Sequence, residues 1–99
     1  MPKPTEILRL TIFREGFYLI AINQKKEEFR EIKPYWKQRL YRKYKEVWFT
    51  NGYGKTRPFM RVECAGIYRD RRDIGEGMIE YFVIQLGEVL EIKNWGTEK

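Results

Sequence analysis

The chain has 99 residues, 42% of them hydrophobic and 16% aromatic, which is the size and apolar content of one folded domain. It contains no histidine and one cysteine, which excludes Ser-His-Asp and Cys-His catalysis and leaves too few soft ligands for a structural zinc site. The net charge of +6 favours an anionic partner, with nucleic acid ahead of an anionic membrane; a mixed-charge soluble surface is the plain alternative.

Several features of the sequence favour a cytoplasmic protein. The longest uncharged stretch, residues 16–24, is too short to cross a bilayer, and residues 1–5 lack the apolar segment of a secretory signal. Cys64 has no second cysteine to pair with, which favours a reducing compartment, and its mid-strand position favours a buried, inert thiol. We expect no membrane attachment; the sequence does not determine the oligomeric state, and a monomer is expected.

The first elements follow from alternation and from residues that end helices. Residues 1–6 contain two prolines and are expected to form an extended, flexible arm, with residues 7–99 forming a single domain. Residues 7–13 alternate apolar and polar side chains, as a half-buried strand does. The apolar run 14–23 fits either a strand or a helix by periodicity. Asn23 favours a short helix, because asparagine tolerates the left-handed conformation that ends helices.

A second strand and a second helix are expected next. Residues 25–33 alternate again, which places Glu28 and Arg30 on one face of a strand and Glu27 on the other. Pro34 favours the first turn of a helix over residues 35–41.

The rest of the chain is expected to be mainly strand. Strands are predicted at 46–50, 59–68, 80–86 and 89–92, the last two meeting at Gly87, with a turn at 51–54 and a polar loop at 69–77. The elements together predict an α+β, mainly β domain: a small closed or nearly closed barrel of five to six strands with two short helices. Closure would remove the exposed edges that such apolar strands otherwise present.

The short expected helix is followed by Asn-Gln-Lys-Lys-Glu-Glu-Phe-Arg, residues 23–30, and then by Pro-Tyr-Trp, residues 34–36. In this order the chain resembles the ASCH family, whose motif is Gly-x-Lys-x-x-Glu-x-Arg just after the first helix. Lys25, Glu28 and Arg30 match the Lys, Glu and Arg of that motif, and Asn23 replaces its Gly. The similarity covers nearly the whole chain and is greatest with small, phage-like, stand-alone members.

The resemblance implies a PUA-like β-barrel whose motif lines a cleft for RNA or a modified nucleoside. Some members of the family hydrolyse the N4-acyl group of acylated cytidines with a Lys, a Thr and a Glu. Lys25 falls on the catalytic Lys, Glu28 falls where those enzymes carry Thr, and no single residue matches their Glu. The resemblance therefore implies a hydrolase acting on a linear amide, with a non-catalytic RNA-binding module or a phage–host interaction protein as alternatives. No metal or cofactor is expected, because the chain lacks histidine and clustered carboxylates.

Two assignments of amide-hydrolysis chemistry fit the residues. Lys25 is the nucleophile if desolvation and the neighbouring cations Lys26 and Arg30 lower its pKa, with Glu28 first and Glu63 second as proton shuttle. Alternatively, Glu28 activates water while Lys25 or Arg30 polarises the acyl oxygen. Because strand side chains alternate, Lys25 meets Glu28 only if it belongs to the turn before the strand. A surface Glu28–Arg30 pair of little energetic value is the plain alternative.

The turn after residue 50 is a second candidate site. Its glycines permit close backbone approach, Tyr53 can stack on a base, and Lys55 and Arg57 can meet phosphate; an ordinary hairpin loop is the alternative. The residues expected to bind a nucleoside or RNA are Lys26, Arg30, Asn51, Tyr53, Lys55 and Arg57.

A basic, aromatic run occupies residues 35–45. Trp36 and Leu40, four residues apart, are expected to pack inward. The charged side chains of this run and of the loop at 69–77 are candidate phosphate contacts or plain solvated charges; they are Lys37, Arg39, Arg42, Lys43, Arg69, Arg71 and Arg72.

Overall fold

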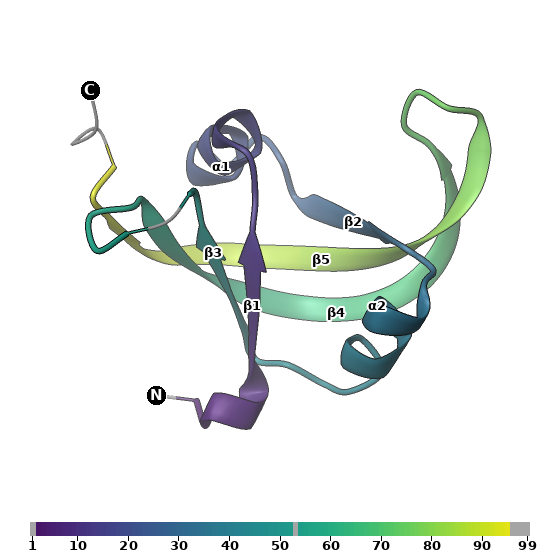
Figure 1. Ribbon diagram of the computed structural model, residues 1–99, viewed down its shortest axis with the longest axis horizontal. Helices are drawn as coiled ribbons and strands as arrows, with labels where there is room; N and C mark the ends of the chain where they lie inside the picture. Colours follow the sequence, from purple (N-terminus) through teal and green to yellow (C-terminus); the bar gives the residue numbers. More distant parts are fainter. Residues whose placement is uncertain (1, 53, 96–99) are drawn as a thin grey trace.

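The structure is a computed structural model that describes residues 2–52 and 54–95. A 3-10 turn η1 (Pro4–Glu6) leads into β1 (Ile7–Thr11), α1 (Arg14–Ala21), β2 (Glu27–Glu31), α2 (Pro34–Arg39), β3 (Glu46–Thr50), β4 (Phe59–Asp73) and β5 (Met78–Lys93). The strands form one curved sheet in the order β1-β3-β4-β5-β2, in which only the β1–β3 pair is parallel (Figure 1). Among the described residues β1 and β2 remain edges, so the fold is α+β, mainly β, with an open sheet.

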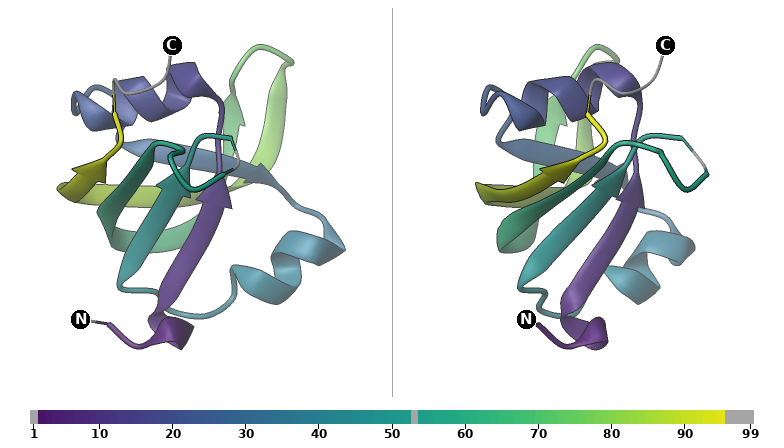
Figure 2. Two further views of the ribbon diagram at one scale, coloured as in Figure 1. Left: turned by 60° about the vertical axis from the view of Figure 1, so that its left-hand side comes forward. Right: turned by 90° about the vertical axis from the view of Figure 1, so that its left-hand side faces the viewer.

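The two helices lie toward opposite ends of the sheet. The end of β5 lies near α1, whereas α2 lies far from α1 (Figure 2) and borders the middle of β4 at residues 67–69. Phe17 and Ile20 of α1 are fully buried against the sheet, and Trp95 stacks on Phe17 at 5.1 Å between ring centroids. Leu40 is buried at the end of α2, and Trp36 packs against the same core, as predicted. No helix in the described ranges is long and apolar enough to span a bilayer.

Several predicted elements are confirmed. The run from residue 14 is helical, Asn23 adopts the left-handed φ of 66°, Pro34 is in the first turn of α2, and the strand at 46–50 has the predicted bounds. The prediction for the N-terminal residues was wrong in part: residues 4–6 form a 3-10 turn where an extended arm was expected. The Glu6 carbonyl of this turn accepts a hydrogen bond from the Lys45 backbone at 2.8 Å.

The prediction for residues 69–77 was wrong. They are not a loop: β4 continues to Asp73 and β5 begins at Met78, so only residues 74–77 connect the strands. Their charged side chains, which favoured the loop prediction, form ion pairs within and between the strands, as Arg69 does with Glu80 at 3.3 Å. The two strands predicted around Gly87 are one strand, β5, and three register shifts opposite it along β4 bend the ribbon.

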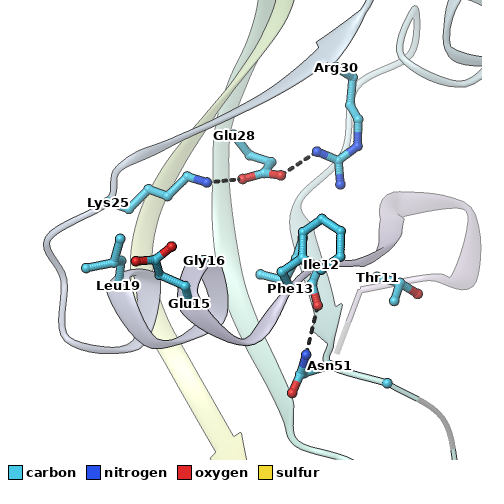
Figure 3. A pocket seen from close by; sticks show the side chains of 11 residues that line it. Thr11, Ile12, Phe13, Glu15, Gly16, Leu19, Lys25, Glu28, Arg30 and Asn51 are labelled. Atoms are coloured by element: carbon cyan, nitrogen blue, oxygen red, sulfur yellow. Dashed lines mark hydrogen bonds and ion pairs between the residues drawn. The ribbon is translucent and has the colours of Figure 1, made fainter. Parts of the chain in front are cut away.

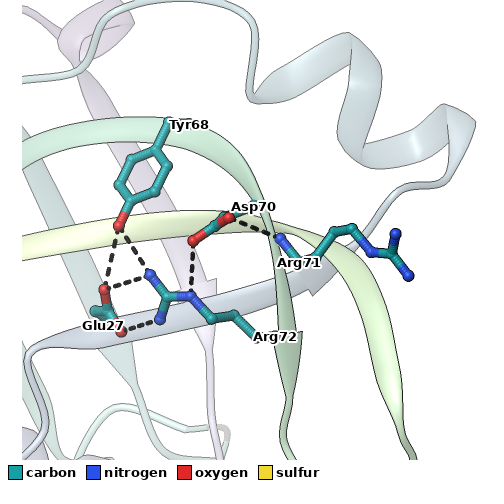
Figure 4. Close-up of polar contacts among 5 residues, drawn as sticks. All are labelled: Glu27, Tyr68, Asp70, Arg71 and Arg72. Atoms are coloured by element: carbon teal, nitrogen blue, oxygen red, sulfur yellow. Dashed lines mark hydrogen bonds and ion pairs between the residues drawn. The ribbon is translucent and has the colours of Figure 1, made fainter.

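An ion-pair cluster fastens β2 to the β4–β5 ribbon. The Arg72 guanidinium donates to both oxygens of Glu27, at 2.7 and 3.2 Å, to Asp70 at 2.9 Å and to the Tyr68 hydroxyl at 3.1 Å (Figure 4). These bonds hold the pKa values of Glu27 and Asp70 below their ordinary range, with the Arg72 hydrogen bond as the largest cause in each. Because Glu27 directly precedes Glu28 on β2, the cluster also fixes the position of the backbone that carries Glu28.

We expect Arg72→Gln to lower the melting temperature by a few degrees at neutral pH and to weaken the loss of stability on acidification. Carboxyls whose pKa is lowered by folding stabilise the fold above their ordinary pKa, and this stability is lost as the pH falls through the folded-state values. Thermal unfolding followed between about pH 7 and pH 3 measures both effects. Arg71→Gln is the matched control, because the Arg71 side chain points away from the cluster (Figure 4). An equal loss of stability on acidification in the two variants would contradict the role given to Arg72.

Candidate functional site

An open cavity of about 780 Å³ lies where the end of β1, the first turns of α1, the segment from Lys25 to Arg30, and Asn51 with Gly52 come together (Figure 3). These segments are distant in the sequence and converge because β1 and β2 are the two edges of one curved sheet, with α1 connecting them. Polar side chains from the first turns of α1, from β2 and from the connection after β3 meet in this cavity.

Glu28 is the centre of this site. Its side chain is only 8% exposed, its Oε2 accepts a hydrogen bond from Arg30, and its Oε1 lies 2.7 Å from the Lys25 ammonium (Figure 3). Oε1 is completely buried and, within the described part of the chain, it has this ion pair but no hydrogen bond of good geometry. A buried carboxylate is stable only when cations and hydrogen-bond donors replace the water molecules that would otherwise solvate it. Glu28 therefore requires the two cations beside it.

Lys25 reaches Glu28 from the turn, which is the condition that strand alternation set for their contact; the predicted strand from residue 25 was too long, because β2 begins at Glu27. The left-handed Asn23 ends α1, and the backbone N–H groups of Gln24 and Lys25 both donate to the Leu19 carbonyl, at 2.9 and 3.1 Å. The turn therefore wraps closely around the end of the helix. A Cβ added at Gly16 would lie 3.7 Å from the Lys25 Nζ, an ordinary contact distance, so the ammonium lies close beside α1.

Arg30 is held by three interactions. Besides Glu28, its guanidinium donates to the Phe29 carbonyl at 2.8 Å and lies 5.3 Å from the centre of the Trp36 ring on α2. A cation over an aromatic face is stabilised by the ring's negative potential. Arg30 thus contributes a fixed positive charge to the cavity wall, and its position depends on α2.

The opposite wall is formed by Phe13 and Asn51. The Phe13 side chain is 90% exposed at the start of α1, and Asn51 donates from Nδ2 to the Ile12 carbonyl at 3.0 Å (Figure 3). Phe13 is a site residue that the sequence analysis missed. The signal was present: in the alternating run 7–13 it takes the phase of the exposed Arg9 and Thr11, where an aromatic ring must face solvent or a ligand.

Charge is nearly balanced around the cavity. Lys25 and Arg30 face Glu28, and Glu15 adds a second carboxylate at the N-terminal turn of α1, which no side chain caps. A polyphosphate would require an excess of cations. The arrangement instead suits a neutral ligand with hydrogen-bond donors and acceptors along one edge and a flat apolar face, such as a nucleobase.

Four predicted site residues come together here: Lys25, Glu28, Arg30 and Asn51. The other predicted site residues that the structure describes do not line the cavity. Glu63 accepts a hydrogen bond from the Glu88 backbone at 3.0 Å and packs on Gly87, where a Cβ would lie 2.8 Å from its Oε1. Its carboxylate therefore stabilises the bulge between β4 and β5.

The remaining binding predictions fall at other places. Lys26 is exposed beside the turn and Lys55 is exposed in the connection after β3, and neither lines the cavity. Arg57 donates to the Gly54 carbonyl at 2.7 Å and lines a different surface hollow. Tyr53 lies outside the described residues. Cys64 is half-buried, and burial raises the pKa of its thiol, in keeping with an inert side chain.

The arrangement limits the chemistry available. An ammonium paired to a carboxylate at 2.7 Å is a hydrogen-bond donor, because the proton occupies its nitrogen lone pair. The Oε1 of Glu28 accepts no hydrogen bond among the described residues, but it is buried beside the Lys25 ammonium, so a ligand contacts it only when that ion pair shifts. No group of three potential metal ligands occurs in the described ranges. No protein-family model, curated protein or solved structure matches the chain.

We expect Glu28→Ala to destabilise the fold by about 1–3 kcal/mol, because two partly buried cations lose their counter-charge. Chemical denaturation measures the change in the free energy of unfolding. Glu15→Ala is the control: this carboxylate lines the same cavity but is exposed, and its loss should cost less than about 1 kcal/mol. Equal effects of the two substitutions would show that Glu28 is not the centre of the charge arrangement.

Proposed function

We propose that the chain is an ASCH-type domain of the PUA-like class that binds a cytosine-type base, in RNA or in a modified nucleoside, in the cavity at Glu28. The observation that carries the proposal is the buried Glu28 carboxylate, held between Lys25 and Arg30 with one oxygen lacking a hydrogen bond, at the base of an open cavity. A cytoplasmic monomer is part of the proposal, since RNA is met there and the lone thiol of Cys64 stays reduced.

The hydrogen-bonding edge of cytosine complements these groups. Its N4 amino group is a donor and suits the Oε1 of Glu28, which lacks a hydrogen bond and is reached when the Lys25 ammonium turns from it toward the acceptors N3 and O2 of the base. The Phe13 ring offers a flat apolar surface on which the base can stack. Uracil carries an acceptor in place of the amino group and would bring two acceptors together at Glu28.

We expect cytidine to bind more tightly than uridine, by about 1–3 kcal/mol, and Glu28→Gln to reduce this preference because an amide can both donate and accept. Titration calorimetry with each nucleoside measures the difference. Glu63→Gln, which removes a carboxylate outside the cavity, should keep the preference. Equal affinity of the wild-type protein for the two nucleosides would contradict recognition through Glu28.

Phe13→Ala should weaken cytidine binding by about 1–3 kcal/mol without lowering stability, because the ring is exposed and its contribution comes from stacking. Phe13→Trp should retain the affinity, since it keeps an aromatic face. The same calorimetric titration decides the point, and an unchanged affinity in Phe13→Ala would remove the ring from the site.

Hydrolysis of N4-acylated cytidine is a second candidate, favoured by the 2.7 Å Lys25–Glu28 pair. Glu28 would take a proton from water as the water oxygen bonds to the acyl carbon, and the Lys25 ammonium would stabilise the oxyanion. The proton is then returned to N4 as the C–N bond breaks, giving cytidine and the carboxylic acid. This role uses Lys25 as a donor and needs no neutral lysine.

We expect the protein to release acetate from N4-acetylcytidine, and Lys25→Ala to abolish this turnover. This variant should also melt at a lower temperature, because the buried Oε1 of Glu28 loses its cation, so turnover is measured well below that melting temperature. Product formation is followed by chromatography. Lys26→Ala, an exposed neighbour of equal charge, is the matched control and should retain activity. Turnover that survives in Lys25→Ala would rule out its role, and a wild-type protein that binds cytidine without turnover would be a binding module.

A further inference from the structure

A second cavity, of about 520 Å³, lies between α2 and the β4–β5 ribbon. Its wall carries two cations, Lys37 and Arg69, and three aromatic rings, Tyr41, Tyr68 and Phe82. Phe82 is buried and lies beneath the Arg69 guanidinium at 5.7 Å, whereas the Tyr41 side chain is 71% exposed. Alternating cations and rings on an open surface are typical of sites for single-stranded nucleic acid.

The two cavities are joined by one row of the sheet. Phe82 on β5 is the register partner of Arg30 on β2 and also of Arg69 on β4, so the three side chains lie on the same face. Arg30 lines the cavity at Glu28, and Phe82 and Arg69 line the second cavity. Two strand spacings, about 10 Å, separate the backbones at Arg30 and Arg69. Long arginine side chains can approach a common phosphate over such a distance.

The charges of the second cavity are available to a ligand. Lys37 is exposed, and its side chain has no ion pair or hydrogen bond in the part of the chain that the structure describes. Arg69 pairs with Glu80 at 3.3 Å, with both side chains half exposed, and such an exposed pair contributes little to stability. Arg72, by contrast, is fully engaged with Glu27 and Asp70. Among the cations that line the two cavities, Lys37 and Arg69 are therefore available to a ligand, while Lys25 and Arg30 are paired with Glu28.

We infer that the ligand is a segment of single-stranded RNA and that the second cavity binds the nucleotide adjacent to the base at Glu28. The adjacent base stacks on Tyr41, and the phosphate between the two nucleotides is bound by Arg69 together with Lys37. This inference rests on the proposed function and names its substrate class: a base within an RNA strand is bound more tightly than the free nucleoside.

The test compares cytidine with the dinucleotide cytidylyl-cytidine by titration calorimetry at several salt concentrations. We expect the dinucleotide to bind at least tenfold more tightly, and Tyr41→Ala to remove about tenfold of its affinity. Tyr41→Phe, which keeps the ring, should restore binding. Arg69→Gln should reduce the dependence of the logarithm of affinity on the logarithm of salt concentration by about 0.7, the value for one phosphate of a single strand.

Two controls separate this inference from the proposed function. Cytidine binding should be unchanged in Tyr41→Ala and Arg69→Gln, since neither residue lines the first cavity. Lys93→Gln makes the same change of charge outside both cavities and should leave dinucleotide affinity unchanged. Cytidine binding with no gain for the dinucleotide, or a gain that survives in both variants, would overturn the second subsite alone. Failure of both ligands to bind would overturn the proposed function and the inference with it.

Discussion

The buried carboxylate of Glu28 is the constraint on which the site depends. A negative charge in this position requires cations, and they come from two elements: Arg30 from the same face of β2, and Lys25 from the turn that closes α1. The geometry of that turn, the register of β2 and the placement of α2 through Trp36 must therefore all be compatible with one carboxylate. On the other face of β2 the Glu27–Arg72 pair holds the same strand against the ribbon, so the strand is fixed from both sides.

Local rules of the sequence predicted the cluster of Lys25, Glu28 and Arg30 because these residues are close along the chain. Alternation placed Glu28 and Arg30 on one face, and the left-handed tolerance of Asn23 indicated the turn that brings Lys25 back. The same rules did not find Glu63 in its bulge, since that position depends on Gly87, which is distant in sequence and paired by the register of β4 and β5. Phe13 was missed because it was read as a strand residue, whereas β1 ends at Thr11 and the ring lies exposed at the start of α1.

The prediction that failed over the most residues was the loop at 69–77, which is mostly β4–β5 ribbon, and the cause is electrostatic. Polar, charged residues from Arg69 onward have the composition of a loop, and composition does not reveal that opposite charges will face each other across a strand pair. Once these pairs form, the ribbon extends well beyond the core and curves past α2 (Figure 1). A flexible loop could not hold Arg69 in line with Phe82 and Arg30, so the second cavity exists only because this segment is strand.

In the proposed complex with RNA, affinity and specificity are therefore separated in space. Inside the first cavity Glu28 and Glu15 offset Lys25 and Arg30, so a phosphate gains little there, and discrimination must come from the edge and face of a base. The net positive charge of the chain lies outside the first cavity, and in the second cavity Lys37 and Arg69 have no buried carboxylate beside them among the described residues. A single nucleoside can use only the contacts of the first cavity, whereas an RNA strand can use those of both cavities. The phosphate charge contributes most to binding where the cations of the protein are not already paired with carboxylates. The balanced charge of the first cavity thus favours the recognition of a base, and it leaves attraction to the phosphates to the ribbon and α2.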